Sequence, residues 1–163
     1  MLGQTENRMT DSVSDGISRA PRIIMLLPIA FLLHLMEEWF ADFSAWTLVA
    51  LGTEVSSVRF VLINTIAFVV FGIGTMAAIR YPRMAWFGVS FAALLGLNGM
   101  LHTIASVGLG QYSPGTVTGL LLYIPLSALV LKSFATRLSV AVFVKSVLFG
   151  VALHGLVAFM AFF

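Results

Sequence analysis

The chain has no cysteine among its 163 residues. Disulfide bonds, thiolate nucleophiles and cysteine metal ligands are therefore excluded, and the redox compartment is left open. Charged residues are also scarce, at 10% of the chain, whereas soluble domains carry roughly 25%. With 60% hydrophobic residues and a mean hydropathy of +1.02, the composition predicts an integral membrane protein. The net charge of +2 comes from dispersed basic residues, so we expect no nucleic-acid partner.

Long apolar runs are abundant, and several approach the ~20 residues that a helix needs to cross a bilayer. We therefore expect an all-α, polytopic membrane helical bundle of about five transmembrane helices. The predicted spans are approximately 23–41, 58–79, 84–107, 116–131 and 140–162. The segment between the first two spans contains Trp46, and it is expected to lie at the membrane interface, where tryptophan is favoured.

The distribution of basic residues predicts the orientation of the bundle. Residues 1–21 are polar and aperiodic, which predicts a disordered cytoplasmic tail, and residues 22–163 are expected to form one transmembrane helical domain. Arginine and lysine gather in the tail and in the connections at 80–83 and 132–137. These segments share one side of a five-span chain, and positively charged segments stay inside. We therefore expect a bacterial plasma (inner) membrane location, with the N-terminus cytoplasmic and the C-terminus non-cytoplasmic.

All three histidines of the chain, His34, His102 and His154, lie inside apolar runs. An ionisable side chain within the hydrocarbon is costly and is by default a functional-site hypothesis. Glu37 and Glu38 follow His34 at i+3 and i+4, so Glu38 shares a stripe of the helix with His34 and Glu37 lies beside it. Counting at 1.5 Å per residue places polar groups from every span in one layer, between mid-membrane and the outer surface. This agreement in depth predicts a single site.

Imidazole and carboxylate groups on neighbouring helices are suited to a divalent metal, with zinc preferred over iron or manganese. The predicted metal ligands are His34, Glu38, His102 and His154. The predicted catalytic residues are Glu37, Glu38 and Asn98. In the metal site the second glutamate acts as general base on the water. In a metal-free alternative the two adjacent carboxylates activate water, while histidine and asparagine stabilise an oxyanion. Predicted substrate contacts, for which structural roles such as interfacial anchoring or helix packing are the alternatives, are Arg59, Asn64 and Tyr123.

The segment HLMEE, with intramembrane histidines farther along a small multi-span chain, resembles the HXXEE-motif family of bacterial membrane proteins. The motif matches at His34, Glu37 and Glu38, and the resemblance covers the chain from about residue 22 onwards. It implies an integral membrane protein without an established activity. The resemblance therefore supports these three site residues and implies no substrate.

The expected function is that of a metal-dependent membrane enzyme, most readily a hydrolase acting on a lipid or another lipophilic substrate, with the lipid bilayer as its partner. One alternative is a proton-coupled transporter or channel that uses the same residues. A second is an accessory membrane subunit, and a third is a hydrogen-bond cluster that only ties helices together. The sequence leaves the oligomeric state open.

Overall fold

The computed structural model describes residues 20–163, and within them it consists of helices joined by short connections, with no strand. The predicted all-α bundle is confirmed, because five helical segments are long and apolar enough to cross a membrane. They span Arg22–Phe40, Ser57–Arg80, Pro82–Leu109, Thr116–Ala135 and Val140–Phe162. The predicted spans agree with these bounds to within four residues. The predicted disordered tail falls almost wholly outside the described residues.

The first span consists of a 3-10 turn, η1, and helix α2, and the short helix α3 follows it. The third span begins with the 3-10 turn η2. The fourth contains a single turn of α-helix, α6, and a π-helical turn, η3, before α7. In chain order the elements are η1 (Arg22–Met25), α2 (Leu26–Phe40), α3 (Phe43–Leu51), α4 (Ser57–Arg80), η2 (Pro82–Met84), α5 (Ala85–Leu109), α6 (Thr116–Thr118), η3 (Gly119–Tyr123), α7 (Ile124–Ala135) and α8 (Val140–Phe162).

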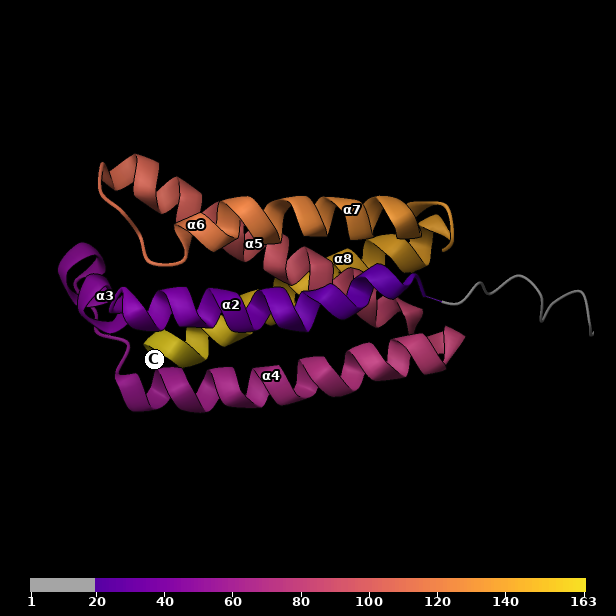
Figure 1. Cartoon of the computed structure of the whole chain (residues 1–163), viewed down its shortest axis with the longest axis horizontal. Coiled ribbons are helices and arrows are strands. Elements are labelled where there is room, and N and C mark those ends of the chain that lie inside the picture. Colours follow the sequence, from indigo (N-terminus) through magenta and orange to yellow (C-terminus); the bar gives the residue numbers. More distant parts are fainter. Residues whose placement is uncertain (1–19) are drawn as a thin grey trace, which may run out of the picture.

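The two ends of the bundle differ in the segments they carry (Figure 1). The start of the described chain lies at one end, together with the α4–α5 and α7–α8 connections. Helix α3, the α5–α6 connection and the C-terminus lie at the other. The connections at the first end contain the basic residues that predicted a cytoplasmic side. We call the other end, where α3 lies, the α3 end.

Helix α5 is the centre of the bundle, and 61% of its most apolar window is buried. Its small residues allow close helix packing, as interfaces in membranes require. A Cβ atom on Gly99 would lie 2.8 Å from the Gly119 carbonyl oxygen, and one on Gly96 would lie 3.0 Å from Ser127 Cβ. Helix α8 also packs closely on α5 at Gly150, where a Cβ would approach the Ser90 carbonyl oxygen to 2.1 Å. These contacts bring the fourth and fifth spans onto α5.

Candidate metal centre and its cavity

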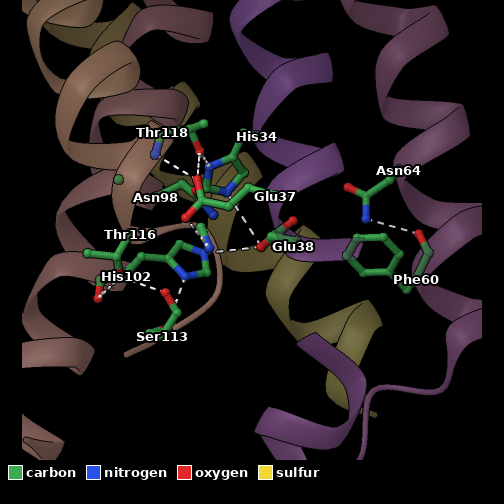
Figure 2. Close-up of polar contacts among 12 residues, drawn as sticks. His34, Glu37, Glu38, Phe60, Asn64, Asn98, His102, Ser113, Thr116 and Thr118 are labelled. Atoms are coloured by element: carbon green, nitrogen blue, oxygen red, sulfur yellow. Dashed lines mark hydrogen bonds and ion pairs between the residues drawn. The ribbon is translucent and has the colours of Figure 1, made fainter. Parts of the chain in front are cut away.

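Three of the predicted metal ligands meet at the α3 end of the bundle (Figure 2). His34 and Glu38 come from successive turns of α2, and His102 comes from α5. Glu38 Oε1 lies 3.5 Å from His34 Nε2 and 3.2 Å from His102 Nε2. One ligand atom from each of the three residues lies within 4.8 Å of the others, and all three side chains are buried. The predicted meeting of imidazole and carboxylate groups from separate helices is therefore observed.

The spacing of these atoms fits a small divalent ion. Zinc bonds to nitrogen and oxygen are about 2.0–2.2 Å long, which in a tetrahedron places neighbouring ligand atoms about 3.3–3.6 Å apart. The two distances from Glu38 Oε1, 3.5 and 3.2 Å, lie in or next to this range. In addition, His34 Nε2 is buried and makes no hydrogen bond within the described part of the chain. The group could therefore hold a metal ion.

Glu37, the other glutamate of the motif, faces the start of the fourth span. Its carboxylate accepts hydrogen bonds from the backbone N–H groups of Gly115 at 3.1 Å, Val117 at 2.9 Å and Thr118 at 2.6 Å. It also accepts from the hydroxyls of Tyr112, at 2.5 Å, and Thr118. An anion is favourable at a helix start, where N–H groups lack partners. Glu37 thus caps α6 from another helix, and its predicted catalytic role stays a prediction.

Thr118 connects the Glu37 carboxylate to His34 of the candidate ligand group, which consists of His34, Glu38 and His102. Its hydroxyl donates to Glu37 Oε2, because an ionised carboxylate only accepts. The same oxygen lies 2.8 Å from His34 Nδ1 and must therefore accept a hydrogen bond from it. We infer that His34 carries its proton on Nδ1, so that Nε2 offers a lone pair toward Glu38. Outer contacts of this kind orient histidine ligands in metal sites.

His102 is held in a similar way by the α5–α6 connection. Its Nδ1 lies 3.2 Å from Ser113 Oγ. The connection is in turn tied to α5, because the Ser113 N–H donates to Ser106 Oγ at 2.8 Å and the Thr116 hydroxyl donates to the His102 carbonyl oxygen at 3.1 Å. Both imidazoles thus present Nε2 to Glu38, while a hydroxyl group contacts the other ring nitrogen.

Gly115 packs directly against both imidazoles. Its φ of +95° is a conformation that residues with a side chain rarely adopt, and a Cβ here would lie 2.6 Å from His34 Cε1 and 3.1 Å from His102 Cε1. Gly110 has a φ of +63° but no atom within 4 Å of a Cβ. Substituting each of the two glycines therefore distinguishes the effect of backbone strain from that of steric overlap with the imidazoles.

We expect Gly115→Ala to displace the imidazoles and to abolish metal binding, whereas Gly110→Ala leaves it intact. Both variants should lose stability by about 1–2 kcal/mol, the cost of a left-handed conformation for an L-residue. Thermal unfolding and metal content of the purified variants measure the two effects. Equal metal content in both variants would contradict the packing of Gly115 against the site.

Tyr112 adds a pH-dependent contact at the α3 end, outside the membrane-spanning segments. Burial, and then its hydrogen bond to the Glu37 carboxylate, raise the pKa of the Tyr112 phenol to about 12. A folded-state pKa above the ordinary value near 10 means that the phenol stabilises the fold below about pH 10. This contribution is lost as the pH rises through 12, because phenolate can no longer donate to Glu37.

We expect Tyr112→Phe to lower stability by about 1 kcal/mol, the net value of one hydrogen bond. The difference from the unsubstituted protein should shrink between pH 10 and pH 12. Thermal unfolding at pH 9 to 12 measures it, with Tyr81→Phe, an exposed tyrosine at the opposite end, as the control. A difference that stays constant over this interval would show that the hydrogen bond makes no contribution.

A cavity of about 380 Å³ opens beside the cluster, and its walls are mostly apolar. Side chains from α2, α3, α4, α5 and α8 line it, and His34, Glu38 and His102 form part of its wall. Native proteins leave few buried polar atoms unpaired. Of the five buried side-chain atoms without a hydrogen bond in the described residues, four belong to residues that line this cavity: His34 Nε2, Trp46 Nε1, Asn98 Oδ1 and Tyr123 OH. The cavity is therefore suited to a ligand that has an apolar body and a polar group.

Most of the other predicted site residues also border this cavity. Tyr123 lies in η3 and stacks on the His34 ring with centroids 4.3 Å apart. Asn98 Nδ2 lies 3.5 Å from His154 Nε2, and both residues line the cavity. Asn64 lines it as well and donates to the Phe60 carbonyl oxygen at 2.9 Å. His154 is not among the three residues of the ligand group.

Arg59 differs from these residues, because it is absent from the residues that line the cavity. Its guanidinium donates to the Ala161 carbonyl oxygen at 3.2 Å and so joins the start of α4 to the end of α8. This contact fits the alternative of a structural anchor. Its predicted role in substrate binding stays a prediction.

Sequence reasoning missed the contribution of the α5–α6 connection. Ser113, Gly115 and Thr118 contact the two imidazoles, although none was predicted as a site residue. The signal was a short Ser-Pro-Gly turn followed by threonines at the start of an apolar run. Such a turn can place hydroxyl and N–H groups against a neighbouring helix, but the sequence does not show which helix.

Comparison with protein families matches residues 25–130 to proteins of unknown function with an HXXEE motif. The chain belongs to the HXXEE family. The matched region contains the motif residues His34, Glu37 and Glu38 together with His102 and the α5–α6 connection, while α8 and His154 lie beyond it. Neither the curated proteins nor the solved structures include a significant match. In this HXXEE protein the first and last motif residues belong to the ligand group, and the middle glutamate caps α6.

Proposed function

We propose that this HXXEE protein is a metal-dependent membrane hydrolase that acts on a lipid or another lipophilic substrate within the bilayer. The observation that carries the proposal is the buried group of His34, Glu38 and His102, with its ligand atoms within 4.8 Å of one another. Zinc is the preferred ion, because two imidazoles, a carboxylate and an open position are typical of catalytic zinc sites. Iron and manganese are the other candidates.

The surroundings of the group support hydrolysis. A bound metal would act as a Lewis acid and activate a water molecule. Water then adds its hydroxyl to the acyl carbon of an ester or amide, the bond from this carbon to the leaving oxygen or nitrogen breaks, and the leaving group takes the remaining proton. His154, held by Asn98, lines the same cavity and is the proposed proton carrier. The Tyr123 hydroxyl and the Asn98 amide are proposed to orient the scissile group.

The opposite half of the bundle supports an enzyme over a transporter. Transport would require a polar path from the cluster to the other side of the membrane. In the described residues, that half has a core of fully buried apolar side chains, which include Ile24, Leu27, Val89, Val130 and Phe134. The cluster is thus associated with a cavity at the α3 end and is separated from the far end by packed hydrocarbon.

The proposal is tested with purified protein in lipid nanodiscs, using lauroyl esters and lauroyl amides as probes. We expect hydrolysis that is lost after treatment with a chelator and restored best by zinc among zinc, iron(II) and manganese. His34→Ala should contain no stoichiometric metal and should be inactive with or without added zinc. Lys145→Ala, which changes an exposed residue of α8 far from the cluster, is the control and should retain both properties.

Three outcomes would contradict the proposal. One is a protein without bound metal that drives pH-dependent ion flux in liposomes, which would support the transporter. Another is purification only in a complex with other chains, which would support the accessory subunit. The third is a metal-free protein in which His34→Ala lowers only the thermal stability, which would support a structural hydrogen-bond cluster.

A further inference from the structure

A second hollow lies next to the cavity of the candidate metal centre, and the two share part of their walls. It has a volume of about 390 Å³ and lies where α2, α3 and α4 meet at the α3 end. Glu38, Phe43 and Phe60 line both spaces. Glu38 therefore stands at the boundary between them. We call the first space the chamber and the second the outer hollow.

The two spaces differ in chemistry. The chamber is mostly apolar and is lined by side chains such as Phe31, Phe71 and Leu95. The outer hollow has polar residues in its wall, namely Asp42, Ser44 and Ser57, and it is flanked by Trp39 and Phe40, which are 52% and 79% exposed. Exposed aromatic residues at a helix end are typical of the headgroup level of a membrane. The chamber therefore suits a hydrocarbon chain, and the outer hollow suits a polar head group.

The size of the chamber limits what enters it. A methylene group occupies roughly the volume of a water molecule in the liquid, about 30 Å³. At about 380 Å³, the chamber therefore holds one chain of roughly a dozen carbon atoms. Two chains of a membrane phospholipid would need about twice this space. A single-chain molecule fits without a change in the packing of α5.

The charge of the outer hollow limits the head group. Two of its eight lining residues, Glu38 and Asp42, carry carboxylates, and none of the eight is basic. Within the described chain, the Arg59 guanidinium is directed to the Ala161 carbonyl oxygen. In the metal-free protein, an anionic head group would therefore meet two carboxylates without a cationic side chain in the wall, whereas a cationic or uncharged head group would meet no repulsion. With a metal bound to Glu38, the carboxylate of Asp42 keeps this negative charge in the outer hollow.

We propose that the substrate is a single-chain amphiphile with a cationic or uncharged head group. Its chain of about twelve carbon atoms lies in the chamber and its head group in the outer hollow, so that the linkage between them lies at Glu38. This inference rests on the proposed hydrolase for the reaction, but the binding itself does not require a metal. Hydrolysis of the linkage would yield a fatty acid and the free head group.

Binding is measured on chelator-treated protein in nanodiscs by tryptophan fluorescence, since Trp46 lines the chamber. The probes are not hydrolysable: dodecyltrimethylammonium, 1-O-dodecylglycerol, dodecyl phosphate and the two-chain 1,2-di-O-dodecylglycerol. We expect the cationic and uncharged single-chain probes to bind at least tenfold more tightly than the other two. Ala158→Phe, in the chamber wall, should weaken their binding at least tenfold, whereas Ala152→Phe, on the exposed face of α8, should have no effect.

Asp42→Asn tests the head-group preference. Asparagine tolerates the left-handed conformation of residue 42, where φ is 52°, and can cap α3 as the aspartate does. We expect this variant to lose part of its discrimination against dodecyl phosphate and to keep its thermal stability. Tightest binding of dodecyl phosphate, equal binding of the two-chain probe, or an unchanged affinity in Ala158→Phe would overturn the inference. A protein that binds the probes as expected but holds no metal would refute the hydrolase and leave the amphiphile site standing.

Discussion

Replacing Glu38 with glutamine is expected to lower the affinity for zinc by more than about 100-fold, which exceeds the ~10–100-fold effect of changes in outer contacts. Glu38 Oε1 is the atom that both imidazoles approach, at 3.5 and 3.2 Å. A neutral amide is a much poorer ligand for zinc than a carboxylate. Hydrolysis of the lauroyl probes should be lost together with the metal. Equilibrium titration with zinc in a competing chelator measures the affinity.

Glu54→Gln is the matched control, because Glu54 is an exposed carboxylate in the α3–α4 connection. It should bind zinc as the unsubstituted protein does. If Glu38→Gln retains stoichiometric zinc, then Glu38 is not a ligand and the proposed centre is wrong. If neither protein binds zinc, iron or manganese, the cluster is a structural hydrogen-bond network and the loss in Glu38→Gln should appear only as lower stability.

Removing the Thr118 hydroxyl is expected to lower zinc affinity by about 10–100-fold although Thr118 touches no metal. In Thr118→Val, His34 Nδ1 loses its acceptor, so the ring is no longer held with its lone pair on Nε2. Glu37→Gln should have a similar effect on affinity and should also destabilise the fold by about 1.5–3 kcal/mol, because partly buried N–H and O–H donors at the start of α6 lose a charged acceptor. Thr118→Ser, which keeps the hydroxyl, should bind zinc as the unsubstituted protein does.

The tautomer of His34 distinguishes the two roles of Thr118. It should change in Thr118→Val if Thr118 orients the ring, and it should stay the same if Thr118 only attaches α6 to α2. Nitrogen-15 NMR of the metal-free protein should show the proton on Nδ1 in the unsubstituted protein and in Thr118→Ser, and a mixture of tautomers in Thr118→Val. Thr103→Val is the control, because the Thr103 hydroxyl donates only to the Gly99 carbonyl oxygen of its own helix. Unchanged tautomer and zinc affinity in Thr118→Val would show that Glu37 and Thr118 serve only to attach α6 to α2.

These two expectations give the two glutamates of the HXXEE motif different tasks. On α2 the residues at i and i+4 face the same direction, so His34 and Glu38 share a ligand group. Glu37 is rotated from them by one residue, and this is enough to direct its carboxylate to the fourth span. The sequence spacing was compatible with either glutamate as a ligand. The neighbouring helices decide, because α5 supplies an imidazole to one carboxylate and α6 supplies N–H groups to the other.

The backbone of the fourth span is a second feature that the sequence pattern did not predict. Its apolar composition predicts one continuous helix, but the structure has a π-helical turn at Gly119–Tyr123 just before Pro125. Proline in a helix removes one backbone hydrogen bond and crowds the preceding turn, so a local change in winding is favourable there. The wider turn places Tyr123 on the His34 ring. The sequence predicted Tyr123 as a site residue because it is a polar residue in an apolar span. Its stacking on His34 depends on this turn and was not predicted.

The amino-acid sequence by itself determined the number of candidate spans, their approximate bounds and the positions of the ionisable residues along them. These properties are local, since they depend on the length of apolar runs and the rise of a helix. Only the tertiary structure decided which side chains meet, because the contacts from Glu38 to His102 and from Glu37 to Thr118 join residues far apart in the chain. Helical periodicity specifies the direction of a side chain relative to its own axis, and the packing of small residues along α5 determines what lies opposite.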